Sequence, residues 1–431
     1  MSQFATAELK SIQDEAREEA YSLPLEELNP AQPRLFSQDA MWPYFERLRN
    51  EAPVHFTADS FYGPYWSVTK FDDIVAIDTD HKTFSSEPNI TLTPKDMQTD
   101  GDGTQLRNSR MFIAMDQPKH DEQRKTVSPA VSPFNLTKLE PLIRERAQNI
   151  LDGLPIGEEF NWVERVSKEL TGMTLATLFG MPQEDRHKLL YWSDVITAAP
   201  GQGLIESYEQ KQEIFMEFGA YFLDQWEDRI NSEPRGDLIS MLAHGAATKD
   251  MDKIEMLGNI VLLTVGGNDT TRNTMSGSVY ALNLFQDQYT KLRDDHSLIT
   301  NMVSETIRWQ TPLAHMKRRA TRDVEFRGQK IKKDDTVVMW YVSGNRDTDV
   351  ITDADNYLID RERARHHVSF GFGIHRCVGN RLAELQLRVI WEEIMKRFPN
   401  IVVTGEPKRS YSTFVKGYET LNVIIPEKLT A

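Results

Sequence analysis

The single cysteine of the sequence, Cys377, lies in a glycine-rich segment that could bind the metal of a large, flat cofactor. A thiolate ligand requires a backbone that comes close to the cofactor, which glycine allows because it has no Cβ. It also requires amide N–H groups that stabilise its charge, and the start of a helix supplies them. An isolated free cysteine is more often a buried structural residue. Here the Gly-x-Gly-x-His-x-Cys-x-Gly spacing favours a ligand, with His375 able to reach a carboxylate on the cofactor.

Two adjacent glycines, Gly266 and Gly267, interrupt a segment that is predicted to be helical over 251–285. Each costs about 1 kcal/mol relative to alanine inside a helix, which indicates that a ligand approaches the backbone or that the helix kinks. Gly266 and Thr270 are four residues apart and share a face. The Thr270 hydroxyl, with Asp269 beside it, could therefore relay protons. The alternative is a solvated acid beside a hydroxyl that bonds back along the helix.

A histidine and an arginine four residues apart, His120 and Arg124, could together bind a carboxylate. Pro118 suits the first turn of the helix that would carry them, and Asp116 is expected to cap that helix. Each of these side chains alone would more often be a solvated surface charge. The pair is therefore a candidate anion site that needs support from other residues.

A glutamate and an arginine three residues apart, Glu305 and Arg308, share one face of a helix that is predicted to end before Pro312. Taken alone, such a pair is usually a surface feature worth less than about 1 kcal/mol. Spacing by itself therefore assigns no function to these two residues.

Taken together, these motifs resemble the cytochrome P450 family of haem-thiolate monooxygenases. The family fingerprint Phe-Gly-x-Gly-x-His-x-Cys-x-Gly is unbroken here, and the resemblance implies that Cys377 is the proximal iron ligand. The oxygen-activation motif of the family, Ala/Gly-Gly-x-Asp/Glu-Thr, matches residues 266–270, which implies proton delivery by Asp269 and Thr270. The fingerprint residues are Phe370, Gly371, Gly373, His375, Cys377 and Gly379.

The same resemblance assigns several charged residues. It implies that four side chains bind the carboxylates of the haem. It also implies that a buried ion pair with a structural role is joined by an arginine further along the sequence. Because the sequence has no Cys-x-x-Cys-His motif, the expected cofactor is non-covalent haem b. The family more often has phenylalanine where Tyr357 stands. The expected carboxylate-binding residues are His120, Arg124, Arg318 and His375, and the expected structural trio is Glu305, Arg308 and Arg361.

Composition excludes several other classes of protein. The chain has 431 residues and a formal net charge of -15, which argues against general binding of nucleic acids or anionic membranes. One cysteine excludes an intramolecular disulfide and an iron–sulfur cluster held by this chain alone. The sequence has no apolar run of the roughly 18 residues that a membrane span needs, and its first twenty residues lack the apolar core of a secretion signal. We therefore expect a cytoplasmic protein.

The elements expected around these motifs make a mainly α protein with small β regions. Helical periodicity dominates 117–310, and a last long helix is expected from near Cys377 to before Pro399. Short strands are expected over 54–75 and 324–342, and a long loop over 86–112. Without alternating β-α-β units, a doubly wound sheet is excluded. The resemblance implies a single P450 domain over 1–431, with a weakly defined extension over 1–35.

The resemblance also implies the reaction and its partners. We expect insertion of one oxygen atom from O2 into an unactivated C–H bond, with electrons from a ferredoxin and its NAD(P)H-dependent reductase. Residues 361–388 contain six arginines and two glutamates, a local charge of +4 in an acidic chain. Such a basic face would steer an acidic ferredoxin toward the thiolate. An ordinary solvated face is the alternative, and Arg361 is expected to be internal.

The segments 111–120 and 371–385 look like those of bacterial terminal alkane and fatty-acid hydroxylases. The expected activity is therefore terminal (omega) hydroxylation of medium-chain alkanes or fatty acids in an apolar channel. The alternatives are a peroxide-driven fatty-acid peroxygenase, a hydroxylase of terpenes or other small apolar molecules, and a haem sensor without enzymatic activity. The candidate pocket residues, which could equally be core residues, are Ile90, Leu92, Leu262, Leu263, Val265, Leu313, Met316 and Phe414.

Overall fold

The computed structural model describes residues 7–95 and 110–429. The helices are α1 (Ala7–Ser22), α2 (Pro33–Ser37), α3 (Trp42–Glu51), α4 (Phe71–Thr79), α5 (Lys119–Val127), α6 (Pro133–Asp152), α7 (Glu169–Phe179), α8 (Arg186–Thr197), α9 (Tyr208–Ile230), α10 (Leu238–His244), α11 (Lys253–Leu284), α12 (Gln286–Asp294), α13 (Ile299–Gln310), α14 (Tyr341–Gly344) and α15 (Asn380–Met395). The strands are β1 (Val54–Thr57), β2 (Tyr65–Val68), β3 (Phe84–Ser85), β4 (Glu159–Asn161), β5 (Met316–Ala320), β6 (Val324–Phe326), β7 (Gln329–Ile331), β8 (Thr336–Met339), β9 (Val402–Val403), β10 (Lys408–Arg409), β11 (Tyr418–Thr420) and β12 (Asn422–Ile424). The predicted class, mainly α with small β regions, is confirmed.

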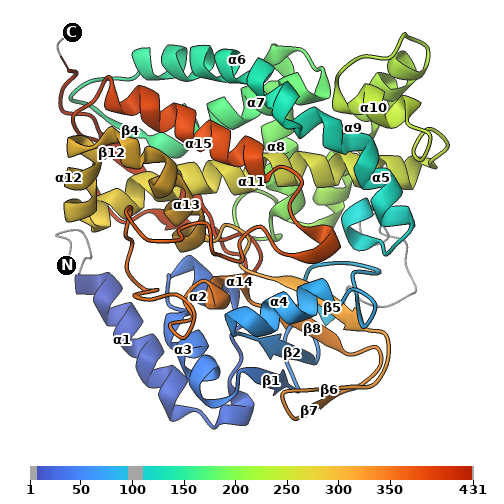
Figure 1. Cartoon of the computed structure of the whole chain (residues 1–431), viewed down its shortest axis with the longest axis vertical. Coiled ribbons are helices and arrows are strands. Elements are labelled where there is room, and N and C mark those ends of the chain that lie inside the picture. The colour runs from blue at the N-terminus through green and yellow to red at the C-terminus, as the bar shows by residue number, and fades with distance from the viewer. Residues whose placement is uncertain (1–6, 96–109, 430–431) are drawn as a thin grey trace.

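Figure 1 shows a helical body crossed by α11 and a smaller part below it that contains β1, β2 and β5–β8. The largest sheet has the order β1-β2-β8-β5-β3, in which β2 and β8 are parallel and the other neighbours are antiparallel. A second sheet has the order β4-β12-β9, so a strand near residue 160 pairs with one near the end of the chain. The pairs β6–β7 and β10–β11 complete the β structure.

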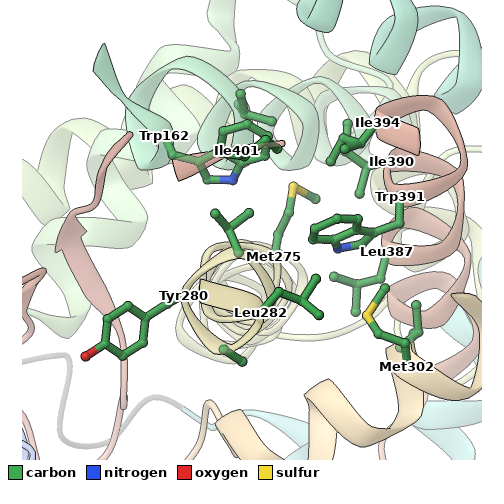
Figure 2. Packing of buried hydrophobic residues seen from close by; sticks show 14 of the residues in the cluster. Trp162, Met275, Tyr280, Leu282, Met302, Leu387, Ile390, Trp391, Ile394 and Ile401 are labelled. Carbon is green, nitrogen blue, oxygen red and sulfur yellow. The ribbon is translucent and has the colours of Figure 1, made fainter. Parts of the chain in front are cut away.

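The core of the helical body surrounds the second half of α11 (Figure 2). The 32-residue helix begins after Asp252, whose side chain accepts a hydrogen bond from the backbone N–H of Glu255 at 3.0 Å, as a favourable N-cap does. Met275 of α11 packs in one cluster with Leu387 and Trp391 of α15, and all three are almost completely buried. This packing fixes α15, and therefore the cysteine that precedes it, against α11.

The described part of the N-terminal extension packs against the rest of the protein. Leu28 and Leu35 are completely buried. The guanidinium of Arg47, on α3, donates hydrogen bonds to the carbonyl oxygens of Ala20 at 2.6 Å and Leu23 at 2.7 Å. These contacts hold α1 against α3.

Two expectations about the β-rich part are wrong. Residues 71–75 were expected to be strand, but they open α4, which buries Phe71 and Ile74 and has Asp72 and Asp73 in its first turn, where acids are favourable. Conversely, β5 was not expected, because its sequence Met-Lys-Arg-Arg-Ala lacks the alternation of a half-buried strand. Pairing with β8 on one side and β3 on the other determines its conformation.

The expected cap of α5 is wrong, and the expected loop lies only partly within the described residues. Asp116 does not cap the helix that carries His120: its carboxylate accepts hydrogen bonds from the Ser85 hydroxyl and from the backbone N–H of Ser86 (3.1 Å), so α5 begins without a side-chain cap. Of the loop expected over 86–112, residues 86–94 form neither helix nor strand. Residues 96–109 lie outside the described part of the chain.

Candidate active site

The cysteine loop, residues 370–379, packs against the end of α4 and leads directly into α15. The backbone N–H of Cys377 donates a hydrogen bond to the carbonyl oxygen of Phe370 at 2.8 Å. Gly371 and Gly373 both have φ of +64°, a conformation that favours glycine. A Cβ on Gly373 would lie 2.5 Å from the carbonyl oxygen of Asp78. The glycines therefore allow the loop to turn and to approach α4.

The accessible surface of the Cys377 side chain faces an internal cavity of about 1420 Å³. Burial raises the pKa of its thiol, and the backbone N–H groups of Gly379 and Asn380 and the charges of Arg124 and Arg376 oppose this effect. The groups that lower the pKa are those that would stabilise a thiolate. The site is therefore suited to a sulfur ligand once a positive metal adds its own charge.

The cavity is large enough for both a flat cofactor and a substrate, since a pocket for one drug-sized ligand typically has a volume of roughly 300–1,000 Å³. Its wall combines the cysteine loop with apolar side chains from distant parts of the chain. All eight candidate pocket residues lie in this wall, namely Ile90, Leu92, Leu262, Leu263, Val265, Leu313, Met316 and Phe414.

The two adjacent glycines of α11 have different surroundings. A Cβ on Gly266 would meet no atom within 4 Å, because Gly266 faces the cavity. A Cβ on Gly267 would lie 2.9 Å from Cδ1 of Leu175, on α7. Thr270 also lines the cavity, and its hydroxyl donates to the carbonyl oxygen of Gly266 at 3.0 Å. Gly266 therefore leaves room for a ligand, whereas Gly267 allows α7 to pack closely.

Asp269 lies in the protein interior and is not part of the cavity wall. Its Oδ1 accepts a hydrogen bond from the Ser193 hydroxyl at 3.2 Å and lies 2.8 Å from Nη2 of Arg272. Burial raises the pKa of Asp269 to about 6, although the charge of Arg272 lowers it. The carboxyl can therefore change protonation near neutral pH.

Charged side chains continue from Asp269 to the protein surface. Arg272 lies 2.5 Å from Asp194, and Asp194 lies 3.1 Å from the ammonium of Lys168. Lys168 in turn lies 2.6 Å from Glu164, whose side chain is 52% exposed. Successive ion pairs thus connect a buried carboxyl beside the cavity to solvent.

The four residues expected to bind carboxylates converge on one side of the cavity. Arg124, Arg318 and His375 line it, and the His120 ring lies 4.2 Å from the His375 ring, centroid to centroid. Nε2 of His120 and both ring nitrogens of His375 are buried and have no hydrogen-bond partner among the described residues. Buried polar atoms are rarely left unpaired in proteins, so these nitrogens indicate a ligand with hydrogen-bonding groups.

The electrostatics of this cluster fit an anionic ligand. Burial, together with the charge of Arg318, lowers the pKa of His375 to about 2, so its ring is neutral and keeps one N–H donor. Two guanidinium groups and two imidazoles can bind a pair of carboxylates. The cluster therefore fits the two propionates of haem b, and Cys377 supplies the sulfur that such a cofactor requires.

Sequence reasoning missed one residue of this cluster, Asp78 of α4, which is 1% exposed. Its carboxylate accepts hydrogen bonds from the Arg318 guanidinium (2.6 Å), the Tyr341 hydroxyl (2.9 Å) and the backbone N–H of Phe372 (2.7 Å). It therefore positions both the arginine and the cysteine loop. No local pattern identifies it, because its partners lie at least 240 residues away in sequence.

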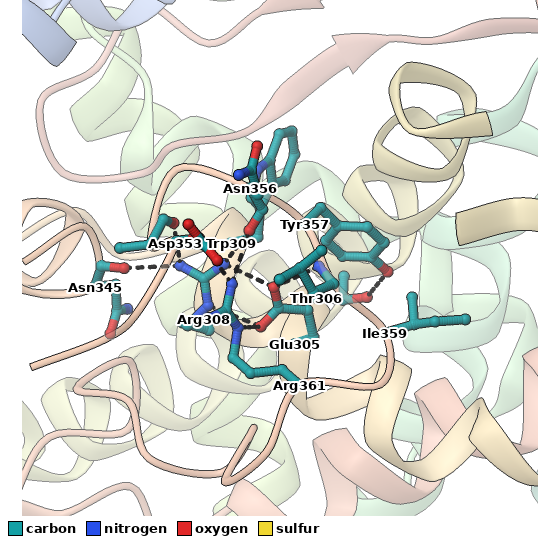
Figure 3. Close-up of polar contacts among 12 residues, drawn as sticks. Glu305, Thr306, Arg308, Trp309, Asn345, Asp353, Asn356, Tyr357, Ile359 and Arg361 are labelled. Atoms are coloured by element: carbon teal, nitrogen blue, oxygen red, sulfur yellow. Dashed lines mark hydrogen bonds and ion pairs between the residues drawn. The ribbon is translucent and has the colours of Figure 1, made fainter. Parts of the chain in front are cut away.

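The trio of Glu305, Arg308 and Arg361 forms a buried cluster away from the cavity wall (Figure 3). Glu305 and Arg308 are completely buried and joined at 2.7 Å, and Arg361 donates to Glu305 at 2.9 Å. Arg308 also donates to the carbonyl oxygens of Asn345 and Ala354, at 2.8 and 2.7 Å. The cluster thus links α13 to the chain segment that leads to the cysteine loop.

The described part of the chain contains neither a metal-binding cluster of acidic, histidine or cysteine side chains nor a membrane-spanning helix. Its histidine, cysteine, aspartate and glutamate side chains form no group of three or more that could hold a metal ion. Within the same residues, no helix combines the length and the apolar character that crossing a bilayer requires.

Comparison with known proteins places this geometry in a family. The family model described as Cytochrome P450 matches residues 61–424. Linalool 8-monooxygenase of Pseudomonas putida is 33% identical over 92% of this chain and 98% of its own length. Methyl-branched lipid omega-hydroxylase of Mycobacterium tuberculosis is 31% identical over 88% of this chain and 90% of its own.

A solved structure shows the same fold. CYP153D17 from Sphingomonas sp. PAMC 26605 superposes with a TM-score of 0.86 and 44% sequence identity, over 94% of this chain and all of that chain. The chain therefore belongs to the cytochrome P450 family and is a monooxygenase, and this membership implies a haem with a cysteine thiolate ligand.

Proposed function

We propose that this P450 hydroxylates the terminal carbon of medium-chain linear substrates, alkanes or fatty acids, in the cavity above Cys377. The observation that carries this proposal is that one cavity combines the cysteine loop with all eight of the predicted apolar pocket residues. An apolar wall binds hydrocarbon chains by removing them from water. The name of the methyl-branched lipid omega-hydroxylase is consistent with such a substrate.

The residues that would hold the cofactor follow from the site. Non-covalent haem b would be bound at its iron by the Cys377 thiolate, and Arg124, Arg318, His120 and His375 would bind its propionates. When bound, the haem supplies the activation of dioxygen at a thiolate-ligated iron and the transfer of one oxygen atom to the substrate.

Proton delivery is assigned to Asp269 and Thr270. The Thr270 hydroxyl lies on the cavity side of α11 and can hold a proton close to the reacting centre. The Asp269 carboxyl faces the ion-pair chain that runs through Arg272 to solvent. Arg272 keeps its own proton and orients the Asp269 carboxyl, which can change protonation near neutral pH and would pass a proton on when its side chain turns toward Thr270.

Electrons are proposed to come from a ferredoxin and its NAD(P)H-dependent reductase. Of the six arginines in 361–388, four are exposed; Arg361 is internal, as expected, and Arg388 is half-buried in ion pairs with Glu140 and Glu392. A basic surface at this place would attract an acidic partner.

We further propose that the chain acts as one P450 domain in the cytoplasm.

A second candidate function is hydroxylation of terpenes, which the similarity to linalool 8-monooxygenase favours. Titration of the haem-loaded protein with dodecane, dodecanoic acid and linalool, followed by the shift of the Soret band, separates the two. The linear-chain proposal predicts shifts with dodecane or the acid and a terminal alcohol as product. A response to linalool alone would overturn it.

Faster turnover with peroxide than with ferredoxin, reductase and NAD(P)H would instead indicate a peroxygenase.

A further inference from the structure

The wall of the cavity has an unusual charge. The chain contains 65 acidic and 50 basic residues, yet the described residues of the wall include no aspartate or glutamate. They include five bases, namely Arg34, Arg124, Lys211, Lys317 and Arg318. A cavity wall whose own charged side chains are all basic favours anionic ligands wherever one of these bases has no acid beside it.

Four of the five bases already have partners or an assigned ligand. Arg34 pairs with Glu19 and Arg318 with Asp78. Arg124 and Arg318 are also the guanidinium groups placed to bind the haem propionates. The ammonium of Lys211 donates to two carbonyl oxygens at the end of α8, those of Ile196 (2.9 Å) and Ala198 (2.8 Å), where a cation is favourable.

Of the five bases in the described wall, Lys317 is the one with neither a partner nor an assigned ligand. Among the described residues, its ammonium has no carboxylate within ion-pair distance and no hydrogen-bond acceptor. Burial lowers the pKa of Lys317 to about 8, Arg319 contributes in the same direction, and no acid opposes them. The Lys317 side chain is partly buried, and withdrawing an ammonium from water without an anion is costly, so a ligand that supplies an anion would bind there favourably.

The position of Lys317 separates it from the propionate cluster. Successive side chains of a strand point to opposite faces, so on β5 Lys317 and Arg318 face different directions. The backbone N–H of Lys317 donates to the carbonyl oxygen of Ile90 at 2.8 Å. Ile90 and Leu92 belong to the apolar wall. The backbone of Lys317 thus lies next to Ile90, and Lys317 belongs to the same cavity wall.

We propose that Lys317 binds the carboxylate of the substrate, so that the enzyme takes linear fatty acids in preference to hydrocarbons of the same length. This inference rests on the proposed function and narrows its substrate class. A chain held at its carboxyl end presents the opposite end to the reacting centre, which favours oxidation near the terminal carbon.

The test compares dodecanoic acid with its methyl ester, which has the same acyl chain but carries a methyl group in place of the negative charge, by Soret titration of the haem-loaded full chain. In the wild type we expect the acid to bind more tightly than the ester. In Lys317→Met we expect the acid to bind about 10- to 100-fold more weakly, because a charge-assisted hydrogen bond is lost, while ester affinity changes by less than about twofold. Lys317→Arg should retain most of the preference.

Lys211→Met is the matched control, because Lys211 is a second partly buried lysine of the same wall, and two of its three ammonium donors are already used. It should change acid and ester affinity to the same extent. The inference is wrong if the wild type binds the ester as tightly as the acid, a result that needs no variant. It is also wrong if Lys317→Met weakens both ligands equally, or if Lys211→Met alone removes the acid preference. Terminal hydroxylation of the ester with no preference for the acid would leave the proposed function standing while this inference fails.

Discussion

The carboxylate of Asp78 accepts a hydrogen bond from the backbone N–H of Phe372, at 2.7 Å, and so joins the end of α4 to the loop that carries Cys377. The same carboxylate holds the Arg318 guanidinium at 2.6 Å. One buried side chain therefore sets the position of the sulfur ligand and of a group that faces the cofactor's carboxylates.

Asp78→Ala should destabilise the protein and weaken haem retention. Removing one partner of a buried ion pair leaves the other charge uncompensated and costs about 3–5 kcal/mol. Thermal unfolding and haem content of the purified protein measure the effect. Tyr341→Phe removes one neutral donor to the same carboxylate and should cost only about 1 kcal/mol. Equal losses in the two variants would contradict the role assigned to Asp78.

Alanine at the two adjacent glycines of α11 should have opposite effects on stability. Gly266→Ala gains up to about 1 kcal/mol of helix propensity, since its Cβ meets no atom within 4 Å. Gly267→Ala gains the same amount but places its Cβ 2.9 Å from Leu175, and overpacking typically costs about 1–3 kcal/mol. Denaturant unfolding of the two variants checks this order. Gly266→Ala should also change ligand affinity, because its methyl group enters open space in the cavity.

The pH dependence of coupled turnover should reflect Asp269. Burial raises the pKa of its carboxyl to about 6, so the protonated fraction falls from about half at pH 6 to about a tenth at pH 7. If this carboxyl delivers protons, the ratio of product to NAD(P)H consumed should fall as pH rises through this range. Asp269→Asn should lower the ratio and remove its pH dependence. An unchanged profile in the variant would count against the relay.

The charged trio should contribute to stability and not to chemistry. Glu305→Gln leaves Arg308 and Arg361 facing a neutral group in the interior and should cost about 3–5 kcal/mol. Asp323→Asn is the matched control: it removes the charged partner of Lys332 in a pair whose side chains are both 64% exposed, and it should leave the unfolding temperature almost unchanged because solvent screens such a pair. Thermal unfolding compares them. A Glu305→Gln protein as stable as the control variant would refute the structural role.

Much of the site is predictable because its motifs are contiguous. The cysteine fingerprint, the Gly266–Thr270 face and the helical pairs each depend on spacing within a few residues, and local spacing survives folding. Asp78 depends on tertiary contacts with three separate segments, which one sequence does not encode locally. The orientation of the Asp269 side chain, which points into the protein interior, depends on how α8 packs against α11. The conformation of β5 depends on its neighbours in the sheet.

The most direct test of the account is the absorption spectrum of the reduced, CO-bound protein after haem loading. Because the chain has one cysteine, any thiolate signature in that spectrum must come from Cys377. We predict this signature in the wild type and its loss in Cys377→Ala. A variant that keeps the signature, or a wild-type protein that binds no haem, would contradict the assignment of Cys377 as the iron ligand.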